Sequence, residues 1–169
     1  EKEISISIPV DLRGMFPSQT FRNFFTVVDV RYNFSKNSSD FDSVLESVAA
    51  QLKEKVNPEY LAKTLNYNMS VQRNWLARAV PLFIKNRVMK IAYRANESTS
   101  TTVVSNVGLV KMPSELEDYI EDFHCLLNPT NVNPVKLTLM SFKNNMVLNF
   151  TSKIAETSIQ KYFLRHLST

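Results

Sequence analysis

The sequence contains very little glycine, cysteine and histidine. Gly14 and Gly108 are the only glycines among 169 residues, so neither a phosphate-binding loop nor a dinucleotide-binding fingerprint can be built. The single cysteine, Cys125, excludes an internal disulfide and a cysteine zinc cluster, and we expect a reducing, cytoplasmic setting. His124 and His166 are the only histidines, and nothing in the sequence indicates that they form a metal site.

Long apolar runs are also missing. No stretch approaches the roughly 20 residues that span a bilayer, and the opening EKEISISIPV lacks the zones of a signal peptide. We therefore expect no membrane partner. The chain enters a strand pattern at once without an initiating methionine, which leads us to expect a fragment of a longer protein.

Charge is modest in total and uneven along the chain. The formal net charge is +4. Acids are missing from residues 70–96, which carry these basic residues: Arg73, Arg78, Lys85, Arg87, Lys90 and Arg94. Bases are missing from residues 115–122, where the acids gather. Such blocks indicate either an anion site and an acidic edge, or two solvated faces. The charge is too weak, and the aromatic residues too little interleaved with it, to predict a nucleic-acid partner.

Hydrophobic periodicity predicts an α+β domain. Alternation and β-branched residues predict strands, and apolar residues at three- and four-residue steps predict helices. The expected strands cover residues 3–10, 23–34, 101–107 and 119–127 and a hairpin over 134–154; the expected helices cover 41–56, 58–79, 81–94 and 157–167. The order indicates one domain over residues 1–169, with a mixed, largely antiparallel sheet and helices on one face.

Few residues suggest catalysis. His124 and Cys125 are adjacent, but neighbours on a strand point to opposite faces, so the imidazole could not readily take the thiol proton. His166 lies in the last turn of a helix, where a cation is favourable, and is interpreted as structural. We therefore predict no catalytic residue and no metal ligand in this chain.

Several phrases resemble a known family. They are IPVDLRGMFPSQTFRNFFTVV, AVPLFIKNRVMKIAY, VVSNVGLVKMP and IAETSIQKYFLRHL. Their order and spacing resemble the C-terminal half of bacterial proteins related to alcohol acetyltransferases. That family belongs to the chloramphenicol acetyltransferase-like fold, which also includes the condensation domains of peptide synthetases.

The resemblance implies one lobe of a two-lobed acyltransferase. In that fold an acyl thioester, carried by coenzyme A or by a carrier protein, enters a tunnel between the lobes. The catalytic histidine belongs to an HxxxD motif of the N-terminal lobe. Here HCLLN has Asn128 where the motif needs aspartate, so we expect this chain to be inactive alone. Its implied partners are the N-terminal lobe and an acyl-CoA thioester as co-substrate, with no tightly bound cofactor.

The resemblance also implies a role for one short stretch. It would place Ser105, Asn106 and Gly108 on the tunnel side of a strand, where a hydroxyl and an amide could hold a carbonyl oxygen. Glycine allows close backbone approach to a ligand. A plain strand exit is the other interpretation, because turn geometry alone favours asparagine and glycine there.

The basic stretch has three interpretations. Its cations, Lys85, Arg87, Lys90 and Arg94, could meet the phosphates of coenzyme A, dock an acidic acyl-carrier protein, or form a solvated face. Docking of a carrier protein by a lobe that has lost its chemistry is the alternative function. A lone lobe could also expose an apolar face and form a homodimer through it.

Overall fold

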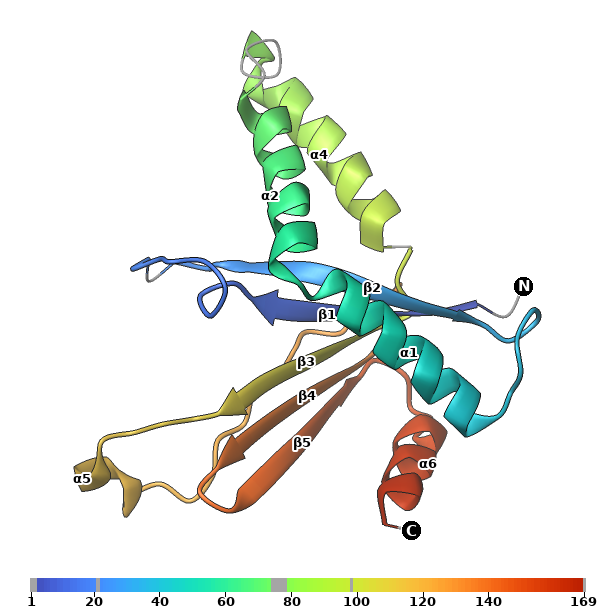
Figure 1. The fold of residues 1–169 in the computed structure, drawn as a ribbon, viewed down its shortest axis with the longest axis vertical. Coiled ribbons are helices and arrows are strands. Elements are labelled where there is room, and N and C mark those ends of the chain that lie inside the picture. The colour runs from blue at the N-terminus through green and yellow to red at the C-terminus, as the bar shows by residue number, and fades with distance from the viewer. Residues whose placement is uncertain (1–2, 21, 74–78, 98, 169) are drawn as a thin grey trace. The chain divides into compact units, whose positions relative to one another are not determined.

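The computed structural model describes residues 3–20, 22–73, 79–97 and 99–168. Figure 1 shows the helices and strands along the chain. Contacts divide the chain into two compact units, Glu1–Thr101 and Thr102–Thr169. The single domain over residues 1–169 stays a prediction, since compact units of this size occur within one domain as well as in separate ones.

The first unit is built on two antiparallel strands. β1 (Glu3–Asp11) pairs with β2 (Phe25–Asn33), and Ile6 lies opposite Val30. Paired residues share one face of the sheet, so the isoleucines of β1 lie beside Val28, Val30 and Tyr32 of β2, which are buried. The first strand was predicted from alternation and the second from its aromatic and β-branched residues, and both are confirmed.

The serine side of β1 is also buried, although the alternation predicted a solvent-facing side. Ser5 and Ser7 are 4% and 8% exposed. The Ser7 hydroxyl donates to Oδ1 of Asp29 over 2.6 Å and lies 2.8 Å from the Ser100 hydroxyl. The Thr101 N–H donates to the Ser5 carbonyl over 2.8 Å. Residues 100–101 therefore lie against β1, a long-range contact that local alternation does not reveal.

Helix α1 (Phe41–Lys55) has Asp40 at its N-cap. Oδ2 of Asp40 accepts from the Ser43 N–H over 3.3 Å, which satisfies one free donor of the first turn. The helix packs along β2 (Figure 1). Nε2 of Gln51 donates to the Arg31 carbonyl over 2.8 Å, and Oε1 of Gln51 accepts from the Arg31 N–H over 3.0 Å. One side chain thus occupies both backbone groups of a strand residue.

Helix α2 (Pro58–Arg73) begins as predicted. Oδ1 of Asn57 accepts from the Tyr60 N–H over 2.8 Å, and Pro58 takes the first helical position. Leu61 is fully buried with Leu12 and Val28 in the core of this unit. The predicted end near residue 79 cannot be compared, because residues 74–78 lie outside the described part of the chain.

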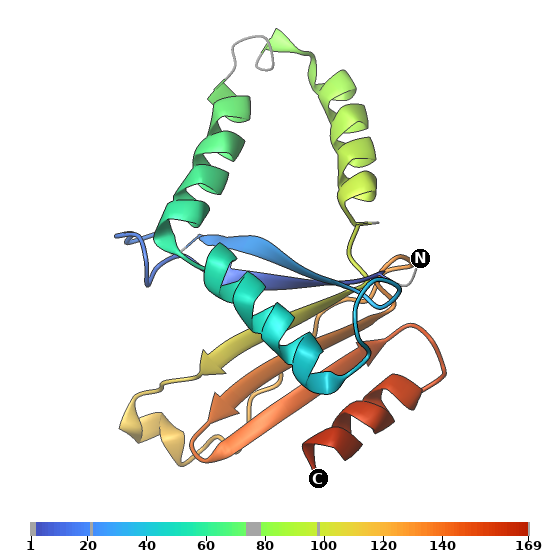
Figure 2. The ribbon, with the colours of Figure 1, turned by 45° about the vertical axis from the view of Figure 1, so that its right-hand side comes forward.

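Helix α4 (Leu82–Glu97) follows Pro81, where a fresh helix or a kink was expected. The carbonyl of Pro81 accepts from the N–H groups of Ile84 and Lys85, which starts the first turn. Figure 2 shows that α2 and α4 extend away from β1 and β2 of the same unit.

Over its described residues, 102–168, the second unit forms three strands and two helices. β3 (Thr102–Leu109) is parallel to β4 (Val135–Phe142), and β4 is antiparallel to β5 (Asn145–Ser152), as the predicted hairpin requires. Helix α6 (Ser158–Leu167) was predicted to begin at Thr157. Phe163 of α6 contacts Phe150 of β5 edge to face, with ring centres 5.4 Å apart. A short helix, α5 (Ser114–Glu117), was not predicted.

The strand predicted over residues 119–127 is wrong. This segment forms no ladder with other strands, although its alternation is real: Phe123 and Cys125 are half-buried and His124 is exposed. The Phe123 ring packs on Phe142 of β4, with centres 5.0 Å apart. The Thr138 hydroxyl of β4 donates to the Cys125 carbonyl. The segment therefore lies over a face of the sheet, and a period of two arises without strand pairing.

The predicted fold class is confirmed. The chain is α+β, and its strand pairing is mixed and largely antiparallel, with β3–β4 as a parallel pair. Within the described ranges, no helix combines the length and the apolar character needed to cross a membrane.

Candidate functional site

The end of β3 carries a β-bulge beside Gly108, the glycine of the predicted site. The register with β4 shifts between Asn106 and Gly108, and Gly108 has φ 80°. Oδ1 of Asn106 accepts from the Gly108 N–H over 2.9 Å. This backbone region favours glycine, because a Cβ would approach the following carbonyl oxygen. The backbone conformation alone therefore explains the glycine.

The space beside Gly108 is open. A Cβ built on this residue would meet no heavy atom of the described chain within 4 Å. Packing therefore does not demand a glycine here, and a ligand would find room against the backbone. The bulge is compatible with both interpretations of the stretch, strand exit and ligand approach.

Ser105 and Asn106 do not act on the same side. They are consecutive residues before the bulge, paired with Thr138 and Leu139 of β4 respectively, so they point to opposite faces of the sheet. One carbonyl oxygen cannot be held by both side chains. Asn106 uses its amide oxygen to hold the bulge and keeps its NH2 group on the exposed side, so the Ser105 hydroxyl is the donor on the half-buried side.

Ser105 belongs to a polar row that crosses three strands. It pairs with Thr138 of β4, which in turn pairs with Asn149 of β5. Thr138 is 1% exposed, and its hydroxyl is taken by the Cys125 carbonyl. Ser105 is half-buried, and its hydroxyl has no hydrogen-bond partner among the described residues. The row places the available Ser105 hydroxyl beside the engaged Thr138 hydroxyl and beside Asn149, whose buried amide nitrogen has no hydrogen-bond partner among the described residues.

Asn149 holds the ring of His124. Oδ1 of Asn149 lies 2.9 Å from Nδ1 of His124. An amide oxygen only accepts, so Nδ1 must carry hydrogen, and in the neutral ring Nε2 keeps the lone pair. The imidazole is exposed, and its orientation is fixed by a partner other than the Asn128 of the HCLLN stretch.

Sequence reasoning missed the pairing of Thr138, Asn149 and His124. Part of this arrangement follows from the sequence. A turn at Lys143 and Asn144 sets the hairpin register, and that register places Thr138 opposite Asn149. The contact of His124 with Asn149 was not readable, because it depends on how the segment 119–127 crosses the sheet.

The predicted cations are divided over helix α4. At 100° per residue, Arg87, Lys90 and Arg94 share one face, and Lys85 lies on the opposite side. Arg87, Lys90 and Arg94 are exposed, and Lys85 is half-buried. Three of the four therefore form a common cationic surface. Arg78 lies outside the described residues.

Two further cations, Arg13 and Lys143, have structural partners. Nη1 of Arg13 donates to Oδ1 of Asp11 over 2.9 Å, and Nη2 donates to the Arg22 carbonyl over 2.7 Å. In the acidic stretch, Nζ of Lys143 donates to the Glu117 carbonyl over 2.6 Å. Among the described residues, no group of three or more His, Cys, Asp or Glu could hold a metal ion.

A shallow cleft of the first unit offers no comparable chemistry. It lies where β2 ends and α1 begins, and its lining consists of Tyr32, Asn37, Ser38, Ser43, Glu46 and Ser47. The Tyr32 hydroxyl there donates to the Ser38 carbonyl over 2.6 Å, which is a structural contact. The end of β3 remains the candidate site.

Comparisons of this chain with protein-family models, with curated proteins and with solved structures find no match.

Proposed function

We propose that this chain is one lobe of a coenzyme A-dependent acyltransferase acting on an alcohol or amine. The sequence resemblance motivates the proposal, and the end of β3 is the structural observation that carries it. There a half-buried Ser105 hydroxyl lies near a glycine whose Cβ position is open. A hydroxyl and an accessible backbone are what an acyl oxygen and a pantetheine arm would require.

In this proposal the Ser105 hydroxyl donates to the acyl oxygen as negative charge develops there. A donor fixed in advance stabilises that charge without reorganisation. Asn106 acts indirectly, since its side chain holds the Gly108 N–H and so keeps the bulge in place.

The proposal assigns the general base to another lobe. His124 is held by Asn149 on β5, and the resemblance puts the catalytic histidine in an HxxxD motif that this chain lacks. That histidine would deprotonate the acceptor. A cytoplasmic location and a coenzyme A thioester as co-substrate belong to the same proposal.

Titration with acetyl-CoA tests the site. Ser105→Ala removes one hydrogen bond and is expected to weaken binding roughly three- to tenfold, while Ser39→Ala, in an exposed loop, leaves it unchanged. Gly108→Asn keeps a residue that tolerates positive φ but fills the open space, so it should weaken binding without a large loss of stability. Unchanged affinity in both site variants would refute the site.

Turnover tests the missing base. We expect the protein alone to release no thiol from acetyl-CoA in the presence of alcohols or amines. Thiol release that disappears in His124→Ala would show that this chain supplies its own base.

The alternative function, docking of an acidic acyl-carrier protein, rests on the cationic surface formed by Arg87, Lys90 and Arg94. Titration with a pantetheinylated carrier protein separates it from the first proposal, which needs only a free coenzyme A thioester.

A further inference from the structure

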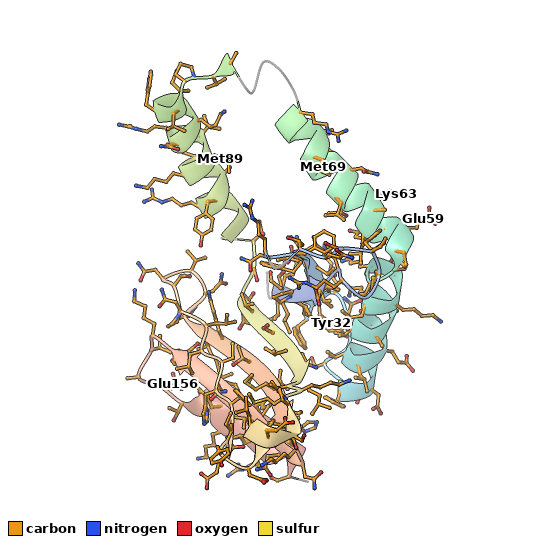
Figure 3. All side chains as sticks on the ribbon, turned by 90° about the vertical axis from the view of Figure 1, so that its left-hand side faces the viewer. Tyr32, Glu59, Lys63, Met69, Met89 and Glu156 are labelled. Carbon is orange, nitrogen blue, oxygen red and sulfur yellow. The ribbon has the colours of Figure 1, made fainter. Side chains whose placement is uncertain are left out.

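Helix α4 exposes an unusual amount of apolar surface. Its exposed apolar side chains are Leu82, Phe83, Ile84, Val88, Met89, Ile91 and Tyr93. Ile91 is 69% exposed and Met89 is 62% exposed; Figure 3 labels Met89 on α4 and Met69 on α2, which is exposed as well. Contiguous apolar surface of this kind marks a contact with another apolar phase.

The apolar and cationic residues of α4 occupy opposite sides. At 100° per residue, the apolar side chains from Ile91 through Val88 to Tyr93 cover an arc of about 200°. Arg87, Lys90 and Arg94 lie within about 60° on the other side. Phe83, in the first turn, lies on the cationic side. Lys85 lies within the apolar arc, where a long alkyl chain can extend its ammonium group toward water.

The charge pattern selects the partner. Residues 70–96 contain no acid, and Glu97, at the last position of α4, is the single acid of the helix beside Lys85, Arg87, Lys90 and Arg94, so the helix is net positive. Two copies of α4 meeting through their apolar sides would cover the apolar arc but leave the cations of each copy on the outer sides without a counter-charge. A surface that is both anionic and apolar beneath satisfies both sides of the helix.

The apolar arc is wide. A helix that packs on a protein uses an apolar stripe of at least about 100°, and the arc of about 200° on α4 is broad enough for a helix that lies with one whole side in an apolar boundary. An interfacial helix sinks sideways into the boundary of headgroups and acyl chains, with its cations at the phosphates. A soluble phosphate ligand such as coenzyme A would engage the cations and leave the apolar arc in water.

We infer that α4 is an interfacial helix that binds the surface of an anionic lipid bilayer. Leu82, Val88, Met89 and Ile91 enter the acyl boundary, and Arg87, Lys90 and Arg94 contact lipid phosphates. This surface is distinct from the end of β3, so it does not depend on the proposed acyl transfer. The expectation of no membrane partner came from the lack of a spanning segment, which does not bear on surface binding.

Vesicle co-sedimentation tests the inference with the whole protein. We expect binding to vesicles of phosphatidylcholine mixed with phosphatidylglycerol, weaker binding to phosphatidylcholine alone, and a decrease with added salt. Lys90→Gln should weaken binding about fivefold, the contribution of one cation near an anionic surface. Ile91→Ser should weaken it about tenfold or more, because a buried isoleucine side chain is removed from the acyl boundary.

Matched controls make the test specific. Lys36→Gln removes the same charge from an exposed position of the first unit, and Leu167→Ser removes an exposed apolar side chain from α6. Both should bind vesicles like the unchanged protein. Circular dichroism confirms that each variant keeps its helices.

Three results would overturn the inference. Equal binding to vesicles with and without phosphatidylglycerol would remove the role of the cations. An equal loss of vesicle binding in Lys36→Gln would show that the net charge of the protein, and not the position of the cations on α4, causes the binding. A change of oligomeric state in Ile91→Ser without lipid, or capture of a carrier protein or coenzyme A by this surface, would show that the surface serves a different partner.

Discussion

Oδ1 of Asn149 lies 2.9 Å from Nδ1 of His124, an arrangement that corresponds to the tautomer with hydrogen on Nδ1. Nitrogen-15 NMR should therefore find the lone pair of His124 on Nε2. In Asn149→Ala that acceptor is gone, and the ring is expected to shift toward the tautomer with hydrogen on Nε2. Asn128→Ala, which changes an exposed asparagine of the same segment, should leave the tautomer as it is. An Nε2–H tautomer in the unchanged protein would contradict the arrangement.

Gly108 and Gly14 form a matched pair for testing the bulge. Neither has a heavy atom within 4 Å of a built Cβ, but only Gly108 has a positive φ. Gly108→Ala should lower the free energy of unfolding by about 1–2 kcal/mol, the cost of that conformation for an L-residue. Gly14→Ala should stay within about 0.5 kcal/mol of the original. Urea unfolding measures both, and equal effects would show that the positive φ carries no cost.

Glu59 and Lys63 form an exposed ion pair on α2, with Nζ and Oε1 2.9 Å apart (Figure 3). The hydrogen bond from Lys63, and then its charge, hold the pKa of Glu59 below the usual glutamate value. A carboxyl whose pKa is lower in the folded state adds stability above its unfolded pKa, and this contribution is lost as the pH falls through the folded pKa. Carbon-13 NMR of the carboxyl should show the pKa rising toward the ordinary value in Lys63→Ala. An unchanged titration would mean that the pair does not form in solution.

The double contact between Gln51 and Arg31 should be measurable as stability. Gln51→Ala removes two hydrogen bonds from the backbone of β2, so we expect a loss of about 1–2 kcal/mol in the free energy of unfolding. Gln19→Ala, in an exposed loop, is the control and should have little effect. A loss no larger than that of the control would show that the two hydrogen bonds do not stabilise the folded protein in solution.

Local patterns predicted the elements whose formation depends on neighbours in sequence. Asp40 and Asn57 cap their helices because a capping oxygen needs only the N–H groups two or three residues ahead. The β4–β5 hairpin follows from two alternating runs on either side of a short turn, where Lys143 takes φ 52° in the absence of a glycine.

Long-range contacts were beyond the same patterns. The segment containing Phe123 and Cys125 alternates like a strand because one side of it lies on the sheet, although it pairs with no strand. Ser5 and Ser7 were expected to face solvent, and Ser100 and Thr101 cover them from more than 90 positions away. At the candidate site, the glycine and its hydroxyl neighbour were predicted, whereas the support of His124 by Asn149 required the structure.

The excursion of the chain through α2 and α4 starts and finishes on the same pair of strands. At its beginning Leu61 packs in the core beside Val28, and at its end the Thr101 N–H donates a hydrogen bond to the Ser5 carbonyl. Changes in the length of the excursion therefore need not disturb either strand. The segment from α2 to α4 could therefore be shortened, extended or exchanged, in evolution or by engineering, while β1 and β2 are kept.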